Sequence, residues 1–541
     1  MFGPDFPFGY DRWLDHPAGL GQLPPHQLGQ PVGIVGGGIA GLVAAYELMR
    51  LGLRPVVFEA EQLGGRMRSA CFPGHPDTVA ELGAMRFPPS ATAFFHYVNL
   101  VGLGTRPFPN PLADATDATL IDINGTRHWA RTSADLPVVY QAVGDAWAKA
   151  LQEGAELSAM DDAIRRRDET TIKSIWNRLV RELDDQSFYG FLSTAPAFVS
   201  FRHRELFGQV GFGTGGWDTD FPNSILEVLR VVYTHADDRH VSIVGGCQRL
   251  PLRLWEHTPE ALAHWPAGTS LAALHPAGPR PAVTRIARDG AGIRVETADS
   301  AEVFPAVVLT PQARLLLTRI DCDESLLPTP VWTAIERTHY EGSSKLFALA
   351  DRPFWREVNP ATGLPLMGTT LTDRTPRGIY LFDDGPDRPG VMCLSYTWND
   401  DSLKVAALPA GERLDLMLRR LGRIYPDVEI RRRIIADPVA VTWETEPHFM
   451  GAFKANLPGH YRYQRRLFNH FVQADLPDHQ RGVFLAGDDV SWTGGFAEGA
   501  VTTGLNAVWG VLRHLGGHTT PANPGPGDVF RAIAPVDLPY D

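Results

Sequence analysis

The chain has 541 residues, a formal net charge of −12 and a pI of about 5.8. A chain of this length exceeds one simple hydrophobic core, so we expect two or three domains. Its acidic balance argues against a nucleic-acid partner, because phosphate binding requires a positive surface.

The cysteines and the N-terminal stretch bear on cellular location. The four cysteines, Cys71, Cys247, Cys322 and Cys393, include no CxxC pair, which suits a reducing cytoplasm and predicts no disulfide. The N-terminal MFGPDFPFGYDRWLDHPAG has aspartates and prolines where a signal peptide needs a basic region and an apolar run. No run of about 18 apolar residues occurs, so no transmembrane helix is expected. We therefore expect a soluble cytoplasmic protein with no membrane partner.

The first periodic element, residues 32–60, reads as a strand, a glycine turn, an Ala/Leu-rich helix and a second strand. Gly36, Gly38 and Gly41 form GxGxxG at the turn. The first glycine permits the turn, the second admits a pyrophosphate, and the third lets helix and strand pack closely. Glu59 ends the second strand, where a carboxylate accepts hydrogen bonds from an adenosine ribose. The pattern predicts a dinucleotide site at a helix N-terminus.

Three later segments are also periodic. Residues 132–185 have helical spacing, and one apolar stripe there comprises Ile172, Ile175, Trp176, Leu179, Val180 and Leu183. Residues 281–311 read as β-ribbons separated by turn residues, followed by a strand. Residues 483–515 repeat the order strand, loop, helix.

These elements predict an α/β fold with α+β inserts, built on a discontinuous Rossmann-like domain. We expect the dinucleotide domain at 32–72, 240–312 and 470–518, a mixed-sheet substrate domain at 73–128 and 313–469, a helical domain at 129–239, and extended terminal arms at 1–31 and 519–541.

The stretch LGGRMRS places Gly64, Gly65 and Arg66 just after Glu59. At these residues the chain resembles the flavin-dependent amine oxidases, in which this glycine pair and arginine wrap the FAD pyrophosphate. The resemblance continues through GGCQRLP at 245–251, PAVTRI at 281–286 and AGDDVSWTGGFAEGAVTTGLNA at 486–507. It implies bound FAD, held noncovalently because the SWTGGFAEG loop has no cysteine.

The same resemblance implies further cofactor contacts. The Val283 backbone would meet adenine, and Asp488 stands where family members often carry a glutamate on the ribityl chain. Val501 would begin the helix whose amide faces the flavin ring. Met85, Arg86 and Gly487 complete the expected cofactor-binding set, and no metal is expected because motifs such as HExxH are absent.

Arg86 lies between a methionine and a phenylalanine in ELGAMRFP. A guanidinium in an apolar setting is costly unless an anion meets it. In the related L-amino-acid oxidases and bacterial amino-acid 2-monooxygenases, this arginine clamps the substrate α-carboxylate, and a tyrosine matching Tyr396 contacts the same group. The alternatives are an Arg86 head that reaches water or Glu81, and a Tyr396 packed within its sheet.

Other residues match the family's catalytic centre. Lys345 matches the lysine that holds a water against flavin N5, although an exposed strand edge would also explain a lysine there. Trp443 matches a tryptophan near the flavin, and Gly495 matches the glycine whose carbonyl receives the substrate amine. Phe496 stands where many relatives have tryptophan.

The motifs FGPDFPF, FGQVGFGTGGWDTDFPNS, GAFKANLPGHYRY and GDDVSWT resemble bacterial L-lysine 2-monooxygenases most closely. The resemblance implies that Asp220 faces a side-chain ammonium and that Phe453 lines the pocket. Asp220 alternatively caps a helix beginning near Ser224. His235 and Ala236, the latter a substrate-pocket residue, depart from lysine-specific members, so arginine and ornithine stay open as substrates.

The resemblance implies oxidation of a basic L-amino acid by hydride transfer from Cα to flavin N5. O2 is the second small-molecule partner, the amide, CO2 and water are the products, and a homodimer is expected. One alternative is an L-amino-acid oxidase that releases 2-oxo acid, ammonia and peroxide. A remote alternative is a non-catalytic protein of the same framework that binds prenylated GTPases.

Overall fold

The structure is a computed structural model that describes residues 1–210 and 222–539. Its central parallel sheet has the strand order β2-β1-β12-β21. The bounds are β1 Pro31–Val35, β2 Arg54–Phe58, β12 Val307–Leu309 and β21 Val483–Leu485. Helix α2, Ile39–Arg50, connects β1 to β2 and confirms the predicted βαβ unit. Strands far apart in sequence thus form one sheet, as the α/β prediction required.

The turn between β1 and α2 depends on glycine. Gly36 has a φ of +102°, which side chains rarely adopt. A Cβ added at Gly41 would lie 2.0 Å from the Gly36 carbonyl oxygen. The glycines therefore let the α2 N-terminus approach the end of β1.

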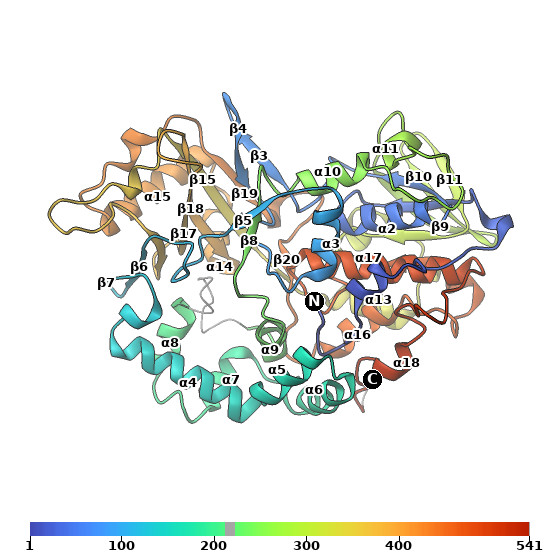
Figure 1. Cartoon of the computed structure of the whole chain (residues 1–541), viewed down its shortest axis with the longest axis horizontal. Helices are drawn as coiled ribbons and strands as arrows, with labels where there is room; N and C mark the ends of the chain where they lie inside the picture. Colours follow the sequence, from blue (N-terminus) through green and yellow to red (C-terminus); the bar gives the residue numbers. More distant parts are fainter. Residues whose placement is uncertain (211–221, 540–541) are drawn as a thin grey trace.

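Helix α17, Ala497–His514, lies beside α2 (Figure 1). A Cβ added at Gly504 would lie 2.7 Å from the Ala40 carbonyl oxygen. The two helices thus meet backbone to backbone. The predicted order of strand, loop and helix over 483–515 is confirmed by β21 and α17.

A four-stranded sheet with the order β11-β10-β9-β13 adjoins the parallel sheet. Its bounds are β9 Val283–Asp289, β10 Gly292–Thr297, β11 Ala301–Phe304 and β13 Asp321–Cys322. The antiparallel ribbons β9 to β11 confirm the pattern read over 281–311.

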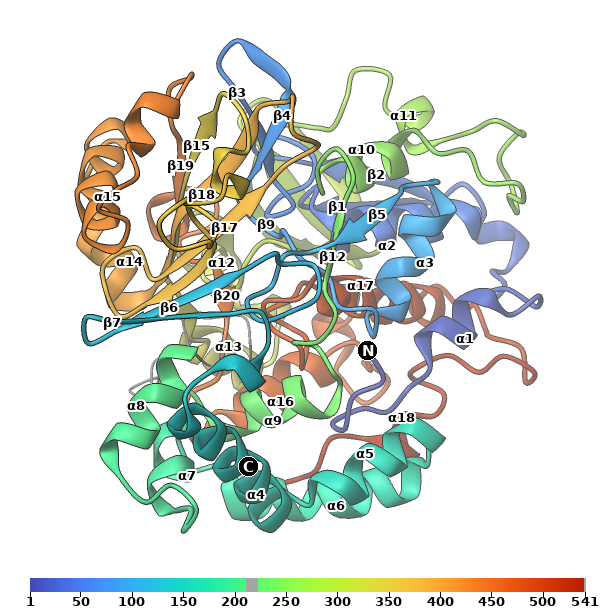
Figure 2. The same cartoon turned by 60° about the vertical axis from the view of Figure 1, so that its left-hand side comes forward.

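A mixed seven-stranded sheet with the order β19-β15-β18-β17-β16-β6-β7 forms the second half of the molecule. Its bounds are β6 Thr119–Ile123, β7 Thr126–Ala130, β15 Ser343–Ala350, β16 Thr369–Thr372, β17 Gly378–Phe382, β18 Gly390–Trp398 and β19 Val439–Thr442. Helices α14, Asn399–Ala406, and α15, Ala410–Ile424, follow β18 and lie beside this sheet in Figure 2.

A helical layer lies below the parallel sheet and the seven-stranded sheet (Figures 1 and 2). It comprises α4 Val138–Ala155, α5 Leu157–Arg166, α6 Glu169–Leu183, α7 Phe188–Thr194, α8 Phe201–Val210 and α9 Ile225–Tyr233. The apolar stripe predicted between Ile172 and Leu183 is buried on α6. The amphipathic pattern therefore identified a helix packed on its neighbours.

The remaining elements connect these layers. They are α1 Tyr10–Asp15, α3 Thr92–Leu100, α10 Arg249–Glu256, α11 Leu271–Leu274, α12 Leu315–Thr318, α13 Thr329–Arg337, α16 Tyr461–Asn469, α18 Phe530–Ile533, β3 Ser69–Phe72, β4 His75–Glu81, β5 Thr105–Pro107, β8 Val241–Ile243, β14 Tyr340–Glu341 and β20 Phe453–Lys454. The two terminal segments contact each other: Asn523 donates to the Trp13 carbonyl oxygen at 3.0 Å. Across the described residues, every helix is too short or too polar to cross a membrane.

The contact between α2 and α17 yields a stability test. Gly504→Ala should lower the unfolding free energy by about 1–3 kcal/mol, because the facing atom is backbone and cannot rotate away. Gly411→Ala in α15 is the matched control, since its added Cβ would have no heavy atom within 4 Å and alanine favours a helix. Thermal unfolding should show a lower midpoint for Gly504→Ala alone; equal midpoints would contradict this packing.

Candidate active site

One long cavity runs between the parallel sheet, the seven-stranded sheet and the turn after α9. Most of the predicted site residues line it: Gly36, Gly38, Glu59, Gly64, Gly65, Arg66, Met85, Arg86, Ala236, Val283, Lys345, Tyr396, Trp443, Phe453, Gly487, Asp488, Gly495 and Phe496. Gly41 and Val501 lie behind the wall, within buried parts of α2 and α17. The prediction that Val501 begins its helix is wrong, because α17 begins at Ala497 and Val501 lies about one turn inside it. Asp220 lies outside the described residues.

Two glycine loops form one end of the cavity. Gly38 forms an isolated β-bridge with Gly64, and a Cβ added at Gly38 would meet open space. The Glu59 carboxylate accepts from the Gly37 amide at 2.6 Å, which fixes it beside the α2 N-terminus. Free amides at a helix N-terminus and an adjacent carboxylate suit a pyrophosphate and a ribose. These residues therefore fit a dinucleotide cofactor.

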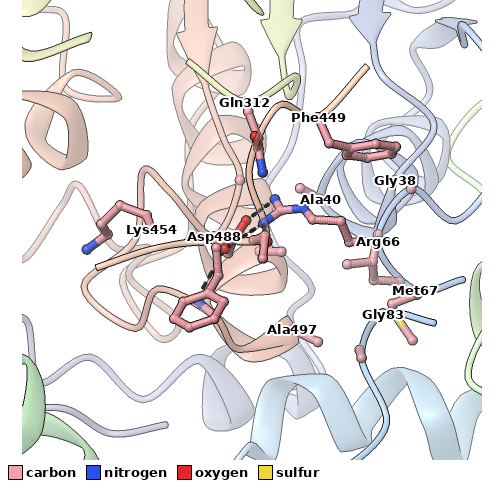
Figure 3. Close-up of a pocket in the computed structure, with 18 of the residues that line it drawn as sticks. Gly38, Ala40, Arg66, Met67, Gly83, Gln312, Phe449, Lys454, Asp488 and Ala497 are labelled. Carbon is pink, nitrogen blue, oxygen red and sulfur yellow. Dashed lines mark hydrogen bonds and ion pairs between the residues drawn. The ribbon is translucent and has the colours of Figure 1, made fainter. Parts of the chain in front are cut away.

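An ion pair spans the middle of the cavity. Arg66 points at Asp488 in Figure 3 and donates to its Oδ2 at 3.0 Å and to the Ala452 carbonyl oxygen at 2.9 Å. A second Arg66 nitrogen bonds Asp488 Oδ1. Asp488 Oδ2 also accepts from the Gly495 amide at 3.2 Å. The carboxylate thus joins the loop after β2 to the loop before α17.

Arg86 lies in a box of aromatic rings. Its guanidinium carbon is 5.8 Å from the Phe108 ring centre, 5.9 Å from that of Tyr380 and 6.0 Å from that of Tyr396. It also donates to the Tyr380 hydroxyl at 3.4 Å. The Glu81 carboxylate accepts from Cys247 and Ser69, so the alternative that Glu81 holds Arg86 lacks support.

Lys345 lies opposite Tyr396 in the register of β15 and β18. Strand β15 is interior, between β18 and β19, and Lys345 is buried, so the exposed-edge alternative is wrong. Its Nζ donates to the carbonyl oxygens of Glu81 and Gly83 and lies 4.9 Å from the Tyr396 ring centre. Burial, assisted by the Arg86 charge, lowers the Lys345 pKa to about 8.

Trp443 and Phe453 supply further aromatic walls. Trp443 donates its Nε1 proton to the Leu82 carbonyl oxygen at 3.1 Å, which fixes the indole at the cavity. A Cβ added at Gly495 would lie 3.1 Å from the Phe453 ring. Phe453 therefore packs directly on the loop that carries Gly495.

The turn between α9 and β8 closes the other end of the cavity with Ala236, Asp237 and His240. The His240 ring bonds Asn110 at 2.8 Å and the Ala236 carbonyl oxygen at 2.9 Å. Burial and the Arg86 charge lower the His240 pKa to about 3, so this ring is neutral at physiological pH. Ser224 caps α9 by accepting from Leu226, so the helix start has a cap of its own.

Sequence reasoning missed several lining or supporting residues. Tyr380 and Phe108 flank Arg86, while Asp237 and Lys454 line the cavity. Tyr380 reads only as part of an apolar strand, but Asp237 directly follows the predicted Ala236 and could have been found from it.

A family model described as flavin-containing amine oxidoreductase matches residues 39–512. The chain belongs to this family. Tryptophan 2-monooxygenase of Pantoea agglomerans pv. gypsophilae is 34% identical over 525 residues, covering 90% of this chain and 89% of that protein. Tryptophan 2-monooxygenase of Pseudomonas savastanoi is 33% identical, covering 96% of each. The protein is therefore an FAD-dependent amino-acid monooxygenase or oxidase.

Solved structures agree on the fold. Putrescine oxidase bound to putrescine has a TM-score of 0.65 at 19% identity, covering 90% of this chain and 99% of that one. Cyclohexylamine oxidase from Brevibacterium oxydans IH-35A has the same score and identity, with 90% and 100% covered. The described residues contain no group of three or more His, Cys, Asp or Glu side chains placed to hold a metal ion.

The buried lysine yields a kinetic test. Lys345→Met should slow flavin reduction or reoxidation by about 10²-fold, the scale of a positioned proton-handling group, while substrate affinity stays within a few fold. In the wild type, the rate of the affected half-reaction should change with pH near pH 8, the pKa of Lys345. The rate should fall above that pH if the reaction uses the Lys345 ammonium, and below it if the reaction uses the neutral Lys345 amine. Stopped-flow absorbance measures both half-reactions.

Lys404→Met, at a lysine 61% exposed on α14, is the matched control and should leave the rates unchanged. A titration near pH 8 that persists in Lys345→Met would contradict the assignment to Lys345.

Proposed function

We propose that the protein oxidatively decarboxylates a basic L-amino acid to its amide, with L-lysine first and L-arginine or L-ornithine next. The observation that carries this proposal is Arg86, a fixed cation whose aromatic box opens on the same cavity as Lys345 and the cofactor cradle. A guanidinium in such a setting favours a carboxylate ligand, which it binds through two parallel hydrogen bonds.

The chain's residues would orient the substrate around its Cα. Arg86 and Tyr396 hold the α-carboxylate and the Gly495 carbonyl accepts from the amine, so that the Cα hydrogen faces the cofactor. Bound FAD would supply the hydride acceptor and the site of O2 reduction. Gly36, Gly38, Glu59 and the Arg66–Asp488 pair would hold it. Fixing both reactants in this way contributes much of the rate through orientation.

The fate of the imino acid separates the two candidate reactions. Aromatic walls from Trp443, Phe453 and Phe496 line the cavity beside Gly495. Such walls would retain the imino acid while peroxide attacks it and CO2 leaves. The likeness to tryptophan 2-monooxygenases favours this route. If the imino acid escapes, water converts it to a 2-oxo acid and ammonia, and peroxide is released.

The proposed preference for a substrate with a basic side chain rests on acidic residues. The motif around Asp220 resembles lysine 2-monooxygenases, and Ser224 fulfils the capping role that was the alternative for Asp220. The tryptophan 2-monooxygenases act, by name, on an aromatic amino acid. Tryptophan is therefore the competing substrate against which the proposal is tested. The homodimer and the cytoplasmic location stay predictions from the sequence.

A product assay tests the reaction and the substrate together. The purified holoenzyme should consume L-lysine, L-arginine or L-ornithine with kcat/KM at least about tenfold above L-tryptophan, because an acid that faces the substrate side chain would favour a cationic one. Mass spectrometry should detect the amide product. A substrate labelled with ¹⁴C at its carboxyl carbon should release ¹⁴CO2. Stoichiometric peroxide and 2-oxo acid would instead establish the oxidase, and a preference for L-tryptophan would overturn the basic substrate.

The carboxylate clamp has its own test. Arg86→Ala should reduce kcat/KM by about a hundredfold or more for every accepted amino acid, since losing the cation removes both affinity and alignment. Arg106→Ala is the control, because Arg106 is 42% exposed and pairs with Asp384. Steady-state kinetics on both variants should separate them; normal turnover by Arg86→Ala would remove Arg86 from the site.

A further inference from the structure

We propose that Asp237 binds the cationic end of the substrate side chain and so determines the specificity for basic amino acids. This inference rests on the proposed function, whose substrate it would explain. Asp237 lies in the turn between α9 and β8 and lines the same cavity as Arg86. The two residues would thus hold the two charged ends of one ligand.

The backbone fixes Asp237 relative to Arg86. Phe87, the neighbour of Arg86, exchanges hydrogen bonds with Val241 at 2.8 and 2.9 Å. On the other side, the Ala236 amide donates to the Val231 carbonyl oxygen at 2.9 Å. The turn that carries Asp237 is therefore attached both to α9 and to the segment that carries Arg86.

The charged groups around Asp237 leave its carboxylate available to a ligand. Its neighbour Asp238 pairs with Arg239 at 3.0 Å, and His235 pairs with Asp161 at 2.8 Å. In the described part of the chain, Asp237 itself forms no ion pair, and its own backbone amide only partly offsets the effect of burial on its pKa. Arg86 acts on it at longer range from the cavity wall.

Glu227, another acid of the cavity wall, differs in this respect. It pairs with Arg230, accepts from Asn456 at 2.9 Å and lies 3.7 Å from Lys454. Its charge is thus already balanced by the protein. Asp237 is the acid of this wall whose partner would come from the ligand.

Burial raises the pKa of Asp237 to about 6, which expresses the cost of an uncompensated carboxylate in this wall. A cation placed there offsets that cost, whereas an indole or an alkyl chain leaves it in place. The same pocket therefore discriminates by charge between a basic side chain and a neutral one.

The test uses 6-aminohexanoate, which has the carboxylate and terminal ammonium of lysine but no α-amine to oxidise, and hexanoate as its uncharged-tail counterpart. Isothermal titration calorimetry on the holoenzyme should give about a hundredfold tighter binding of 6-aminohexanoate. Asp237→Asn should abolish that preference and keep hexanoate affinity, which also reports an intact Arg86 site. Asp238→Asn, the same change at an exposed neighbour, should keep the preference.

The pH dependence adds an independent readout. The preference for 6-aminohexanoate should fall as pH drops below about 6, because the protonated Asp237 no longer attracts a cation. Asp238, His235 and Arg86 also act electrostatically on the Asp237 carboxylate. The same pH titration of the Asp237→Asn variant therefore serves as the reference for the wild type. A preference that persists in Asp237→Asn would overturn the assignment.

Turnover by the same variants separates the two proposals. If the wild type oxidises L-lysine or L-arginine and Asp237→Asn matches Asp238→Asn, the role of Asp237 is wrong while the basic substrate stands. If the wild type oxidises L-tryptophan and no basic amino acid, the proposed substrate fails and this inference fails with it.

Discussion

Two cations contact one aromatic ring in the centre of this cavity. The Tyr396 ring centre lies 6.0 Å from the Arg86 guanidinium carbon and 4.9 Å from Lys345 Nζ. Like charges this close repel, and the Arg86 charge contributes to the lowered Lys345 pKa. The two cations can lie this close because the Tyr396 ring attracts both of them, and because main-chain carbonyl oxygens accept hydrogen bonds from Lys345. An anionic ligand would reduce the repulsion further, which supports the proposal that a carboxylate binds here.

Strand register places these groups. Lys345 and Tyr396 are directly paired across β15 and β18, so their side chains project from the same face of the sheet. A slip of one residue would turn both away from the cavity. Buried apolar residues such as Leu346 and Leu394 face the other side and hold the register. The polar site is thus positioned by the hydrophobic packing behind it.

Local sequence patterns predicted more of the fold than of the site. The glycine spacing and the apolar stripe of α6 specify local geometry, and both features appear in the structure. The aromatic box around Arg86 could not be derived in this way, because Phe108, Tyr380 and Tyr396 come from separate segments that only the tertiary fold brings together. Family likeness supplied Tyr396, whereas Tyr380 reads as one more apolar strand residue.

The two ends of the cavity are built on different parts of the molecule. Lys345 lies on the seven-stranded sheet and the glycine loops lie at the parallel sheet, whereas Ala236 and Asp237 lie on the turn that follows α9 in the helical layer. In the proposed function, the groups around Cα could therefore stay the same while substitutions in one turn change the side-chain end. Such a separation would allow a chain about one-third identical to tryptophan 2-monooxygenases to keep the proposed reaction framework while residues of one turn determine which side chain fits.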